Sequence, residues 1–360
     1  MLRSLIVTAV GLACGACSSM PDKTMIPVSA VAEGTTRVPI LVATTRQPVP
    51  GDPGAMFNGE RANVVSYAAV TISVPPDEAR TVGHVQWPSS TPGDPRREFV
   101  TVAANYIDKN EFSSALASAT GGKRRKVLVF VHGFNNRFDD AVFRFAQIVH
   151  DSKSPAIPIL FTWPSRGEVA LRAYTYDRDS ATYSRDALEQ LLTTLSRNPN
   201  VSEINVVAHS MGNWLTLETL RTLAVQEARA PDRMHLDKLK NILLVSPDVD
   251  VDVFRSQMHR IGAYKPRIAL FLSQDDSVLG LSNLIWGGTA RLGDINPNEE
   301  PYRSELARDN ILVFDLTKLR SSGDSPHSRA FDDITTVMTM IETRLARQDH
   351  KSTVDRADLR

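Results

Sequence analysis

The feature that most constrains the fold is a regular alternation, from residue 126 onward, of short apolar runs with longer segments of helical period. KVLVFV (126–131) is apolar over almost its whole length, which is typical of a strand buried on both sides. The segment 137–151 that follows repeats its apolar residues at spacings of three and four, which predicts a helix. Buried strands that alternate with helices predict a parallel sheet covered by helices on both faces.

The same alternation continues almost to the end of the chain. Further strands are predicted in PILFTW, INVVAHS, NILLVSP, RIALFLS and ILVFDL, and further helices over 179–197 and 212–228. A final amphipathic helix is predicted with one apolar face made of Ile334, Val337, Met338, Ile341 and Leu345. We therefore expect one α/β domain over residues 37–346, with a mostly parallel, doubly wound sheet, and a charged C-terminal tail over 347–360.

The stretch before residue 126 has a different rhythm. Turns rich in Pro, Gly and Asp separate four short β-like runs, VPILVATT, SYAAVTISVP, GHVQWP and EFVTVAANY. These runs predict a β-rich N-terminal edge to the domain. Residues 18–36 are polar and lack a sustained period, so we expect them to form a flexible tether.

The first 17 residues predict export. A positive start, MLRS, precedes the apolar stretch LIVTAVGLACGA, which is too short to cross a bilayer and has the plan of a secretory signal peptide. Cys17 directly follows the small residues Gly15 and Ala16, as the lipidated cysteine of a bacterial lipobox does. Cys14, a plain cleaved signal peptide and a short membrane anchor remain alternatives. We expect lipid anchoring at Cys17 in the cell envelope, on the outer membrane facing the periplasm if the organism has one.

Composition narrows the classes of function. The two cysteines both lie in the targeting segment, so the exported domain would lack disulfides and metal sites built on thiolates. Lys+Arg and Asp+Glu number 41 each, so no net field favours binding to nucleic acid. A hydrophobic content of 42% permits a core large enough to fold without bridges.

Ser210 ends the INVVAHS strand, and Gly212 and a predicted helix follow it. A nucleophilic serine on a sharp strand–turn–helix elbow needs small neighbours, because the backbone there is strained. Ala208 and Gly212 meet that requirement, although AHSMG is not a strict G-x-S-x-G. The alternative is a serine that caps the helix.

The end of the KVLVFVHGF strand suits an oxyanion hole. Acyl transfer needs backbone N–H groups aimed at the oxygen on which negative charge develops, and each donor contributes roughly 10²–10³-fold in rate. In this architecture one N–H belongs to the residue after the nucleophile, Met211, and the other to a loop after an earlier strand. The turn His132–Phe134 is in place for the second, with the Phe134 amide as donor.

An acid and then a base should follow Ser210 in the chain. Candidate acids after the next two strands are Asp248, Asp250, Asp252, Asp275 and Asp276. Chain order and loop position select His327, after the last strand, as the base, because His350 lies in the charged tail and His235 and His259 precede the acid.

These motifs carry a resemblance over about residues 38–345. In order, they are ATTR, VHGFNNRFDDA, TWPSRG, YTYDRDSA, AHSMGN, SPDVDVDVF, SQDDSVL and GGTARLGD. The chain resembles the α/β-hydrolase superfamily, and within it a bacterial subgroup catalogued as a domain of unknown function. Family members carry an Asn-Asp pair where this chain has Asp275-Asp276. The resemblance therefore implies that Asp276 is the acid, while Asp275 and Asp248 stay open.

The remaining motif residues have structural interpretations. We expect Trp163 and Pro164 to pack rather than to line an acyl pocket, and the PDVDVD aspartates to cap the next helix and bond loop amides. Tyr174 and Asp177 form either a buried structural pair or part of the entrance.

The sequence thus predicts a serine hydrolase of carboxylic esters, small or lipid, in which Ser210, His327 and Asp276 act through an acyl-enzyme and Phe134 and Met211 amides hold the oxyanion. This chemistry requires no metal or organic cofactor. Acyl transfer to an envelope lipid or glycan hydroxyl, cleavage of amides or lactones, and a non-catalytic binding role are the alternatives.

Overall fold

A computed structural model describes residues 21–29, 32–229, 236–262, 266–276, 279, 290–319 and 326–338. The predicted signal peptide with Cys17 and the charged tail over 347–360 lie outside the described residues. Within the described part of the chain, no helix combines the length and the apolar character needed to cross a bilayer.

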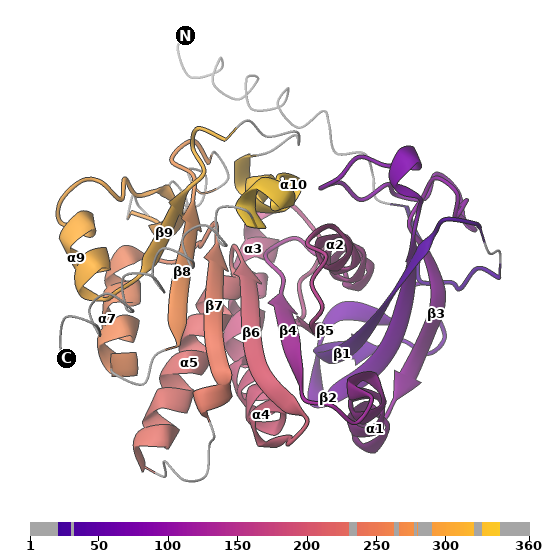
Figure 1. Ribbon diagram of the computed structural model, residues 1–360, viewed down its shortest axis with the longest axis horizontal. Helices are drawn as coiled ribbons and strands as arrows, with labels where there is room; N and C mark the ends of the chain where they lie inside the picture. The colour runs from indigo at the N-terminus through magenta and orange to yellow at the C-terminus, as the bar shows by residue number, and fades with distance from the viewer. Residues whose placement is uncertain are drawn as a thin grey trace, which may run out of the picture.

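The described strands form one nine-stranded sheet in the order β3-β2-β1-β5-β4-β6-β7-β8-β9 (Figure 1). β2 pairs antiparallel with β1 and β3, and every other pairing in the sheet is parallel. The predicted α/β class and the β-rich N-terminal edge are therefore confirmed. The strands are β1 (Thr36–Pro48), β2 (Phe57–Val74), β3 (Val100–Ile107), β4 (Arg125–Val131), β5 (Ile157–Thr162), β6 (Val201–His209), β7 (Leu239–Val245), β8 (Arg267–Leu272) and β9 (Leu312–Asp315).

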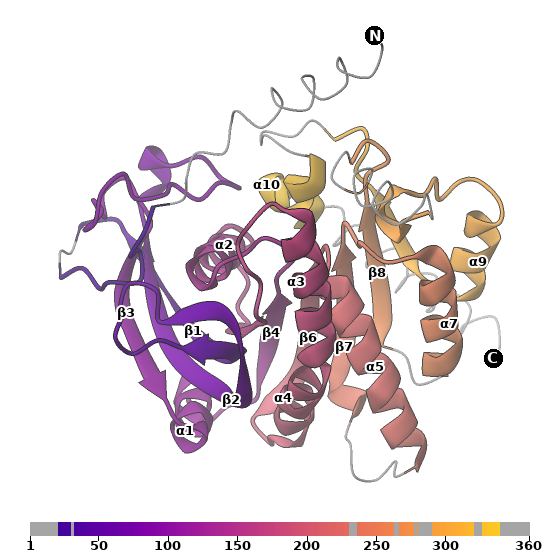
Figure 2. The ribbon, with the colours of Figure 1, turned by 180° about the vertical axis from the view of Figure 1, so that it is seen from behind.

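Helices cover both faces of the sheet. α2 and α10 lie on one face, and Figure 2 shows α3, α4, α5 and α7 on the other. The helices are α1 (Lys109–Thr120), α2 (Phe138–Asp151), α3 (Leu171–Tyr183), α4 (Arg185–Arg197), α5 (Gly212–Arg229), α7 (Val251–Ile261), α9 (Tyr302–Arg308) and α10 (Arg329–Asp332). The short 3₁₀ turns are η1 (Asp77–Ala79), η2 (Leu236–Lys238), η4 (Leu292–Asp294) and η5 (Pro326–Ser328).

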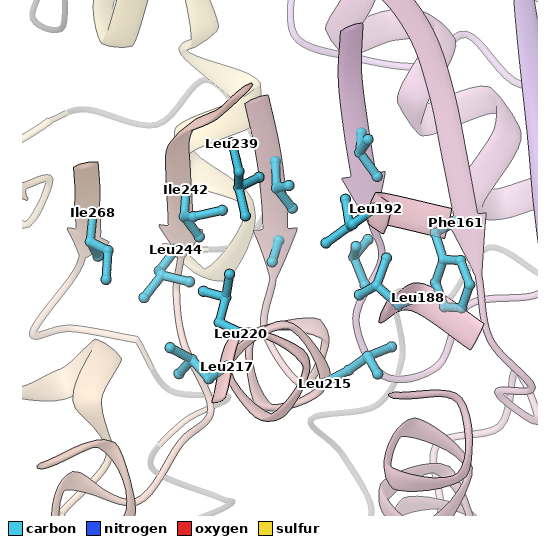
Figure 3. Packing of buried hydrophobic residues seen from close by; sticks show 14 of the residues in the cluster. Phe161, Leu188, Leu192, Leu215, Leu217, Leu220, Leu239, Ile242, Leu244 and Ile268 are labelled. Atoms are coloured by element: carbon cyan, nitrogen blue, oxygen red, sulfur yellow. The ribbon is translucent and has the colours of Figure 1, made fainter. Parts of the chain in front are cut away.

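The core has two layers because successive strand residues point to opposite faces of a sheet. In β4, Val127, Val129 and Val131 join the layer under α4 and α5, whereas Phe130 joins the layer under α2. Figure 3 shows the first layer, where leucines of α4 and α5 pack on β6 and β7. Two apolar faces on each strand explain the nearly continuous apolar runs in the sequence.

Some elements differ from those predicted. The single helix expected over 179–197 is two helices that meet at Ser184. The Ser184 hydroxyl donates to the Ser180 carbonyl at 2.7 Å and also contacts the Thr45 hydroxyl at 2.8 Å, so a buried polar side chain competes with the helical pattern there. GHVQWP forms no strand among the described residues, and its Trp87 ring instead stacks on Phe143 of α2.

α1 is a further helix that was not predicted from the sequence. Its N-terminus carries a capping box, in which the Asp108 carboxylate accepts from the Glu111 amide and the Glu111 carboxylate accepts from the Asp108 amide. Gly121 ends the helix in a left-handed conformation. The pattern D-x-x-E with a later glycine was the signal that could have predicted this helix.

The tether prediction is wrong for residues 21–29, which pack against the domain. Met25 is fully buried, and the Val28 amide donates to the Thr101 carbonyl at 2.8 Å. The Thr24 hydroxyl donates to Asp139 of α2 at 2.6 Å. Short segments without a period can still be ordered by a few buried contacts, which periodicity alone does not reveal.

Candidate functional site

Ser210 lies on a strained elbow between β6 and α5. Its φ of 50° falls in the left-handed region that non-glycine residues rarely occupy. Hydrogen bonds hold it there: its amide donates to the Val245 carbonyl at 2.9 Å, and its carbonyl accepts from the Asn213 amide at 3.1 Å and side chain at 2.9 Å. Such strain at the end of a parallel strand is the geometry expected of a nucleophile elbow.

The turn after β4 lies directly against this elbow. A Cβ on Gly212 would lie 2.4 Å from the His132 carbonyl oxygen, and a Cβ on Gly133 would lie 2.8 Å from the Ser210 Cβ. Neither approach leaves room for a side chain, so glycine is required at both positions. The predicted oxyanion turn, which ends in Phe134, and the predicted nucleophile therefore lie side by side.

Asp276 and His327 meet at the same edge of the sheet. The His327 Nδ1 lies 2.7 Å from Asp276 Oδ2. The exposed fraction is 11% for the His327 side chain and 0% for the Asp276 side chain. Asp276 follows β8, while His327 lies in the short turn η5 before α10. A hydrogen bond from Nδ1–H to a carboxylate leaves the other ring nitrogen unprotonated, as a general base requires.

His209 and Ser246 bring His327 next to the elbow. The His327 carbonyl accepts from the Ser246 hydroxyl at 3.1 Å and lies 3.1 Å from His209 Nε2. The His209 and His327 ring centroids are 4.8 Å apart. Burial, together with the charge on His327, lowers the pKa of His209 well below its usual range, so the His209 ring is neutral. Sequence analysis assigned no role to His209 or Ser246, although both sit at strand ends beside predicted site residues.

Neither alternative acid faces His327 in this way. Asp275 forms a bidentate ion pair with Arg329, whose NH2 lies 2.8 Å from Oδ2. Asp248 accepts from the Tyr174 hydroxyl at 2.5 Å and lies 3.5 Å from Arg291 Nε. Of the three carboxylates, Asp276 is therefore the one that contacts the predicted base. Asp250 caps α7 by accepting from the amides of residues 252 and 253, as predicted for the PDVDVD motif.

The motif residues around His132 form a buried polar network behind the turn. Trp163 is fully buried, its ring stacks on His132, and its indole N–H donates to the His132 carbonyl at 2.9 Å. The Trp163 amide in turn donates to His132 Nε2 at 3.1 Å. Burial, and then the charge of Arg46, lower the pKa of His132 to about 3, so this histidine is neutral and structural. Trp163 therefore packs, as expected.

Arg46 of β1 joins three segments around the turn. Its guanidinium is fully buried and donates to Thr162 Oγ1 at 2.8 Å, to the Ser165 carbonyl at 3.1 Å and to the Asn136 carbonyl at 2.6 Å. Desolvation lowers the pKa of Arg46 to about 10, which still leaves it charged at neutral pH. Most hydrogen bonds of this guanidinium thus go to backbone carbonyl oxygens rather than to a carboxylate.

Asp177 completes the network from α3. Its carboxylate accepts from the Ser165 hydroxyl at 2.5 Å, from the Arg166 amide at 2.9 Å and from the Asn135 amide at 3.4 Å. Tyr174 and Asp177 had two alternatives, a buried structural pair or part of the entrance. Both residues are buried, but the Tyr174 hydroxyl donates to Asp248 and the Tyr174 ring packs on Phe134. The two residues lie three apart on α3 and point to different partners.

No group of three or more His, Cys, Asp or Glu side chains within the described ranges is arranged to hold a metal ion.

The match to a protein family agrees with this architecture. Residues 108–344 match the family described as "Alpha/beta hydrolase of unknown function (DUF900)". No curated protein matches the chain. Among solved structures, acyl-protein thioesterase 2 of Zea mays is 15% identical, with a TM-score of 0.34 over 62% of this chain and 95% of that one. An inhibited esterase B of Lactobacillus rhamnosis is 10% identical, with a TM-score of 0.37 over 91% of this chain and 92% of that one. Est1E of Butyrivibrio proteoclasticus is 12% identical, with a TM-score of 0.34 over 62% and 90%. Likenesses this distant say nothing of this chain's substrate.

Proposed function

The chain belongs to the alpha/beta hydrolases of unknown function, DUF900, and we propose that it is a serine hydrolase that cleaves carboxylic esters through an acyl-enzyme. The observation that carries the proposal is the hydrogen bond between Asp276 and His327, 2.7 Å long, at the strand edge where Ser210 occupies a strained elbow. A buried acid–base pair beside a strained serine is the arrangement that activates a hydroxyl for attack.

The proposed reaction proceeds in two steps. The Ser210 hydroxyl oxygen attacks the acyl carbon, its proton passes to His327 Nε2, and the amides of Phe134 and Met211 stabilise the oxyanion. The leaving alkoxide takes the proton from His327, and the C–O bond to it breaks. Water then attacks the acyl carbon and loses a proton to His327. The bond from the acyl carbon to the Ser210 oxygen breaks, that oxygen takes the proton back from His327, and the acid leaves. Asp276 holds the imidazole orientation and stabilises its cation throughout.

Three structural features support the assigned roles. Gly133, which directly precedes Phe134, approaches the elbow so closely that a Cβ on it would lie 2.8 Å from the Ser210 Cβ. Met211 directly follows Ser210 and is buried at the start of α5. The chain order of serine, acid and base is the order that this fold uses.

Probe labelling tests the nucleophile. A fluorophosphonate should label the native protein and fail to label Ser210→Ala, while Ser118→Ala, which changes an exposed serine on α1, should label like the native protein. Hydrolysis of p-nitrophenyl esters should fall by about 10⁶-fold in Ser210→Ala. Equal labelling of the native protein and Ser210→Ala would end the proposal.

A series of esters with acyl chains of increasing length would define the substrate class. Measurements of kcat/KM across the series, with the products analysed with and without an added alcohol, would separate hydrolysis from transfer of the acyl group to a hydroxyl. Free acid as the dominant product in both conditions is expected from the proposal.

We also propose that a lipid on Cys17 anchors the protein in the cell envelope. The apolar stretch before Cys17 and the small residues beside it support this. In a bacterial host, radiolabelled palmitate should enter the full-length protein and Cys14→Ala but not Cys17→Ala. Incorporation that depends on Cys14 instead would move the modified residue to that position.

A further inference from the structure

Arg329 joins the segment that carries the proposed base to the segment that carries the proposed acid. It follows His327 by two residues, and its guanidinium donates to Oδ1 of Asp275 at 2.9 Å and to Oδ2 at 2.8 Å. Asp275 in turn directly precedes Asp276. We infer that the Arg329–Asp275 pair is a positioning clamp that sets the contact between Asp276 and His327. The kinetic consequences of this inference rest on the proposed function, whereas the contact between Arg329 and Asp275 does not depend on that function.

The clamp extends to a third segment. The Ser273 hydroxyl at the end of β8 donates to Asp275 Oδ1 at 2.6 Å and accepts from Arg329 NH1. The same NH1 donates to the Leu316 carbonyl, just after β9, at 2.9 Å. One guanidinium therefore ties together the ends of β8 and β9 and the start of α10. The Arg329 side chain is 6% exposed, whereas the Asp275 side chain is 47% exposed, so the cation is buried and the carboxylate lies at the surface.

Local structure alone does not hold either functional side chain firmly. Asp276 lies in a turn, and His327 lies in a 3₁₀ turn of three residues followed by a helix of four. Elements this short leave orientation to tertiary contacts. A misplacement of about 1 Å in a catalytic group can reduce the rate about 10²-fold. A planar, bidentate arginine–carboxylate pair fixes both distance and angle, which a single point charge does not.

The ion pair also persists under acidic conditions. The hydrogen bond from Arg329 is the main cause that lowers the pKa of Asp275 to about 2, with a smaller contribution from the Ser273 hydroxyl. Asp275 is therefore charged wherever an acyl-transfer site based on a neutral histidine could operate. Among the described residues, the charged or titratable groups near His327 include Asp276, the neutral His209 and the Arg329–Asp275 pair. Asp294 acts on Asp276, Arg144 acts on His209, and Asp333 acts on Arg329.

Replacement of Arg329 by Met distinguishes two roles of this side chain, positioning of Asp276 and a purely electrostatic effect on His327. The two roles move the pH profile of kcat/KM in opposite directions. Removal of a cation near His327 favours the imidazolium, so a pure charge effect moves the acid limb of kcat/KM to higher pH. Loss of the Asp276 contact disfavours the imidazolium, so a displaced clamp moves the limb to lower pH. Since a carboxylate within about 4–6 Å shifts such an equilibrium by roughly 1–3 pH units, we expect a net shift of about one unit to lower pH.

Asp275→Asn is the milder second variant if Arg329→Met does not fold. Asp275 is 47% exposed, so this change is tolerated more easily, and it weakens the clamp while it keeps the side-chain shape. We expect kcat for a p-nitrophenyl ester to fall about 10-fold or more with KM nearly unchanged. The matched control is Glu305→Gln, which removes an ion pair between α7 and α9. In this pair, Nε and Nη2 of Arg255 lie 2.9 Å and 2.8 Å from one oxygen, Oε2 of Glu305. Glu305→Gln should leave kcat and the pH profile as in the native protein.

A measurement without substrate makes the clamp testable even if the protein is not an esterase. The His327 Nδ1 proton, identified by its loss in Asp276→Asn, should give a downfield imidazole NMR signal in the native protein. This signal should move upfield or vanish in Arg329→Met and Asp275→Asn and stay in Glu305→Gln. An unchanged signal in both clamp variants, or an acid limb that moves to higher pH in Arg329→Met, would overturn the inference. If the signal changes in the two clamp variants as expected but the native protein shows no Ser210-dependent turnover, the proposed function is refuted and the inference about the clamp holds.

Discussion

The His327 ring and the Asp276 carboxylate form a 2.7 Å hydrogen bond across 51 residues of sequence. The neighbouring residue, Asp275, has a different partner, because its carboxylate accepts from Arg329. Two adjacent aspartates in one turn thus have separate functions in the structure, one facing the proposed base and one facing a buried arginine.

This separation predicts a clear ranking of two isosteric variants. Asp276→Asn should reduce kcat for a p-nitrophenyl ester by about 10⁴-fold, because an amide favours the wrong tautomer of His327 and does not stabilise its cation. Asp275→Asn should cost no more than about 10²-fold, since it acts only through position. Steady-state kinetics on both variants, with circular dichroism as a check of folding, would test the ranking. A larger loss in Asp275→Asn would assign the acid to the other carboxylate.

Gly212→Ala should disrupt the elbow. The added Cβ would lie 2.4 Å from the His132 carbonyl oxygen, so the turn before Phe134 must move away from Ser210. We expect a loss of kcat of about 10²-fold and a lower melting temperature. Gly51→Ala is the matched control, because a Cβ there meets no atom within 4 Å, and it should change neither quantity.

Arg46→Lys should impair turnover although it preserves charge. A lysine ammonium cannot reach Thr162, the Ser165 carbonyl and the Asn136 carbonyl together as the planar guanidinium does. Each acceptor left unpaired costs about 1–3 kcal/mol, and the turn that carries Phe134 loses its support. We expect a lower kcat and a lower melting temperature. Arg61→Lys, which changes an arginine bound to α3 residues instead, should affect kcat little.

Asp151→Asn should destabilise the protein in a pH-dependent way. Burial alone raises the pKa of Asp151, but hydrogen bonds from His150, Arg80 and Gln147 outweigh it and hold the pKa well below its usual range. The variant removes the buried carboxylate that lies 2.5 Å from Arg80 and, among the described residues, leaves this cation only the exposed Asp77 carboxylate, at 3.6 Å. Loss of the buried pair should cost at most about 3–5 kcal/mol of unfolding free energy at pH 7.

The sign of the pH effect follows from the depressed pKa of Asp151. The stabilisation is fully present above the unfolded-state pKa of about 4 and is lost as the pH falls below it. Urea unfolding of the native protein and Asp151→Asn at pH 7, 5 and 3 should therefore show a constant difference at the two higher values and a smaller one at pH 3. A difference that grows at pH 3 would contradict this account.

A soluble form of the domain should start near residue 21 rather than at 37. Residues 21–29 bury Met25 and Val28 and hydrogen-bond to Thr101 and Asp139. A chain that begins at residue 37 loses these contacts, and burial of two apolar side chains contributes roughly 1.5–3 kcal/mol each. Chemical denaturation should show lower stability for the shorter chain. Within the longer chain, Met25→Ala should lower stability and Ser29→Ala, at an exposed position, should not.

The amino-acid sequence alone determined the class of fold and the order of the proposed site residues along the chain. Strands with two buried faces and helices with one give periods of apolar residues that can be read along the chain, so the α/β architecture was predictable. Chain order and loop position were also enough to predict that Ser210, His327 and the Asp275-Asp276 pair lie at one edge of a parallel sheet. Local signals that were present but overlooked, such as the capping box before α1, belong to the same class of information.

Only the tertiary structure decided between neighbours and between partners. Asp275 and Asp276 are alike in type and position, and what separates them is that Arg329, 54 residues away from Asp275, faces one of them. Arg46 binds segments up to 119 residues away, and residues 21–29 are ordered by contacts with α2 and β3. Such contacts depend on which side chains meet in space, and a one-dimensional pattern carries no record of the distances that make a hydrogen bond.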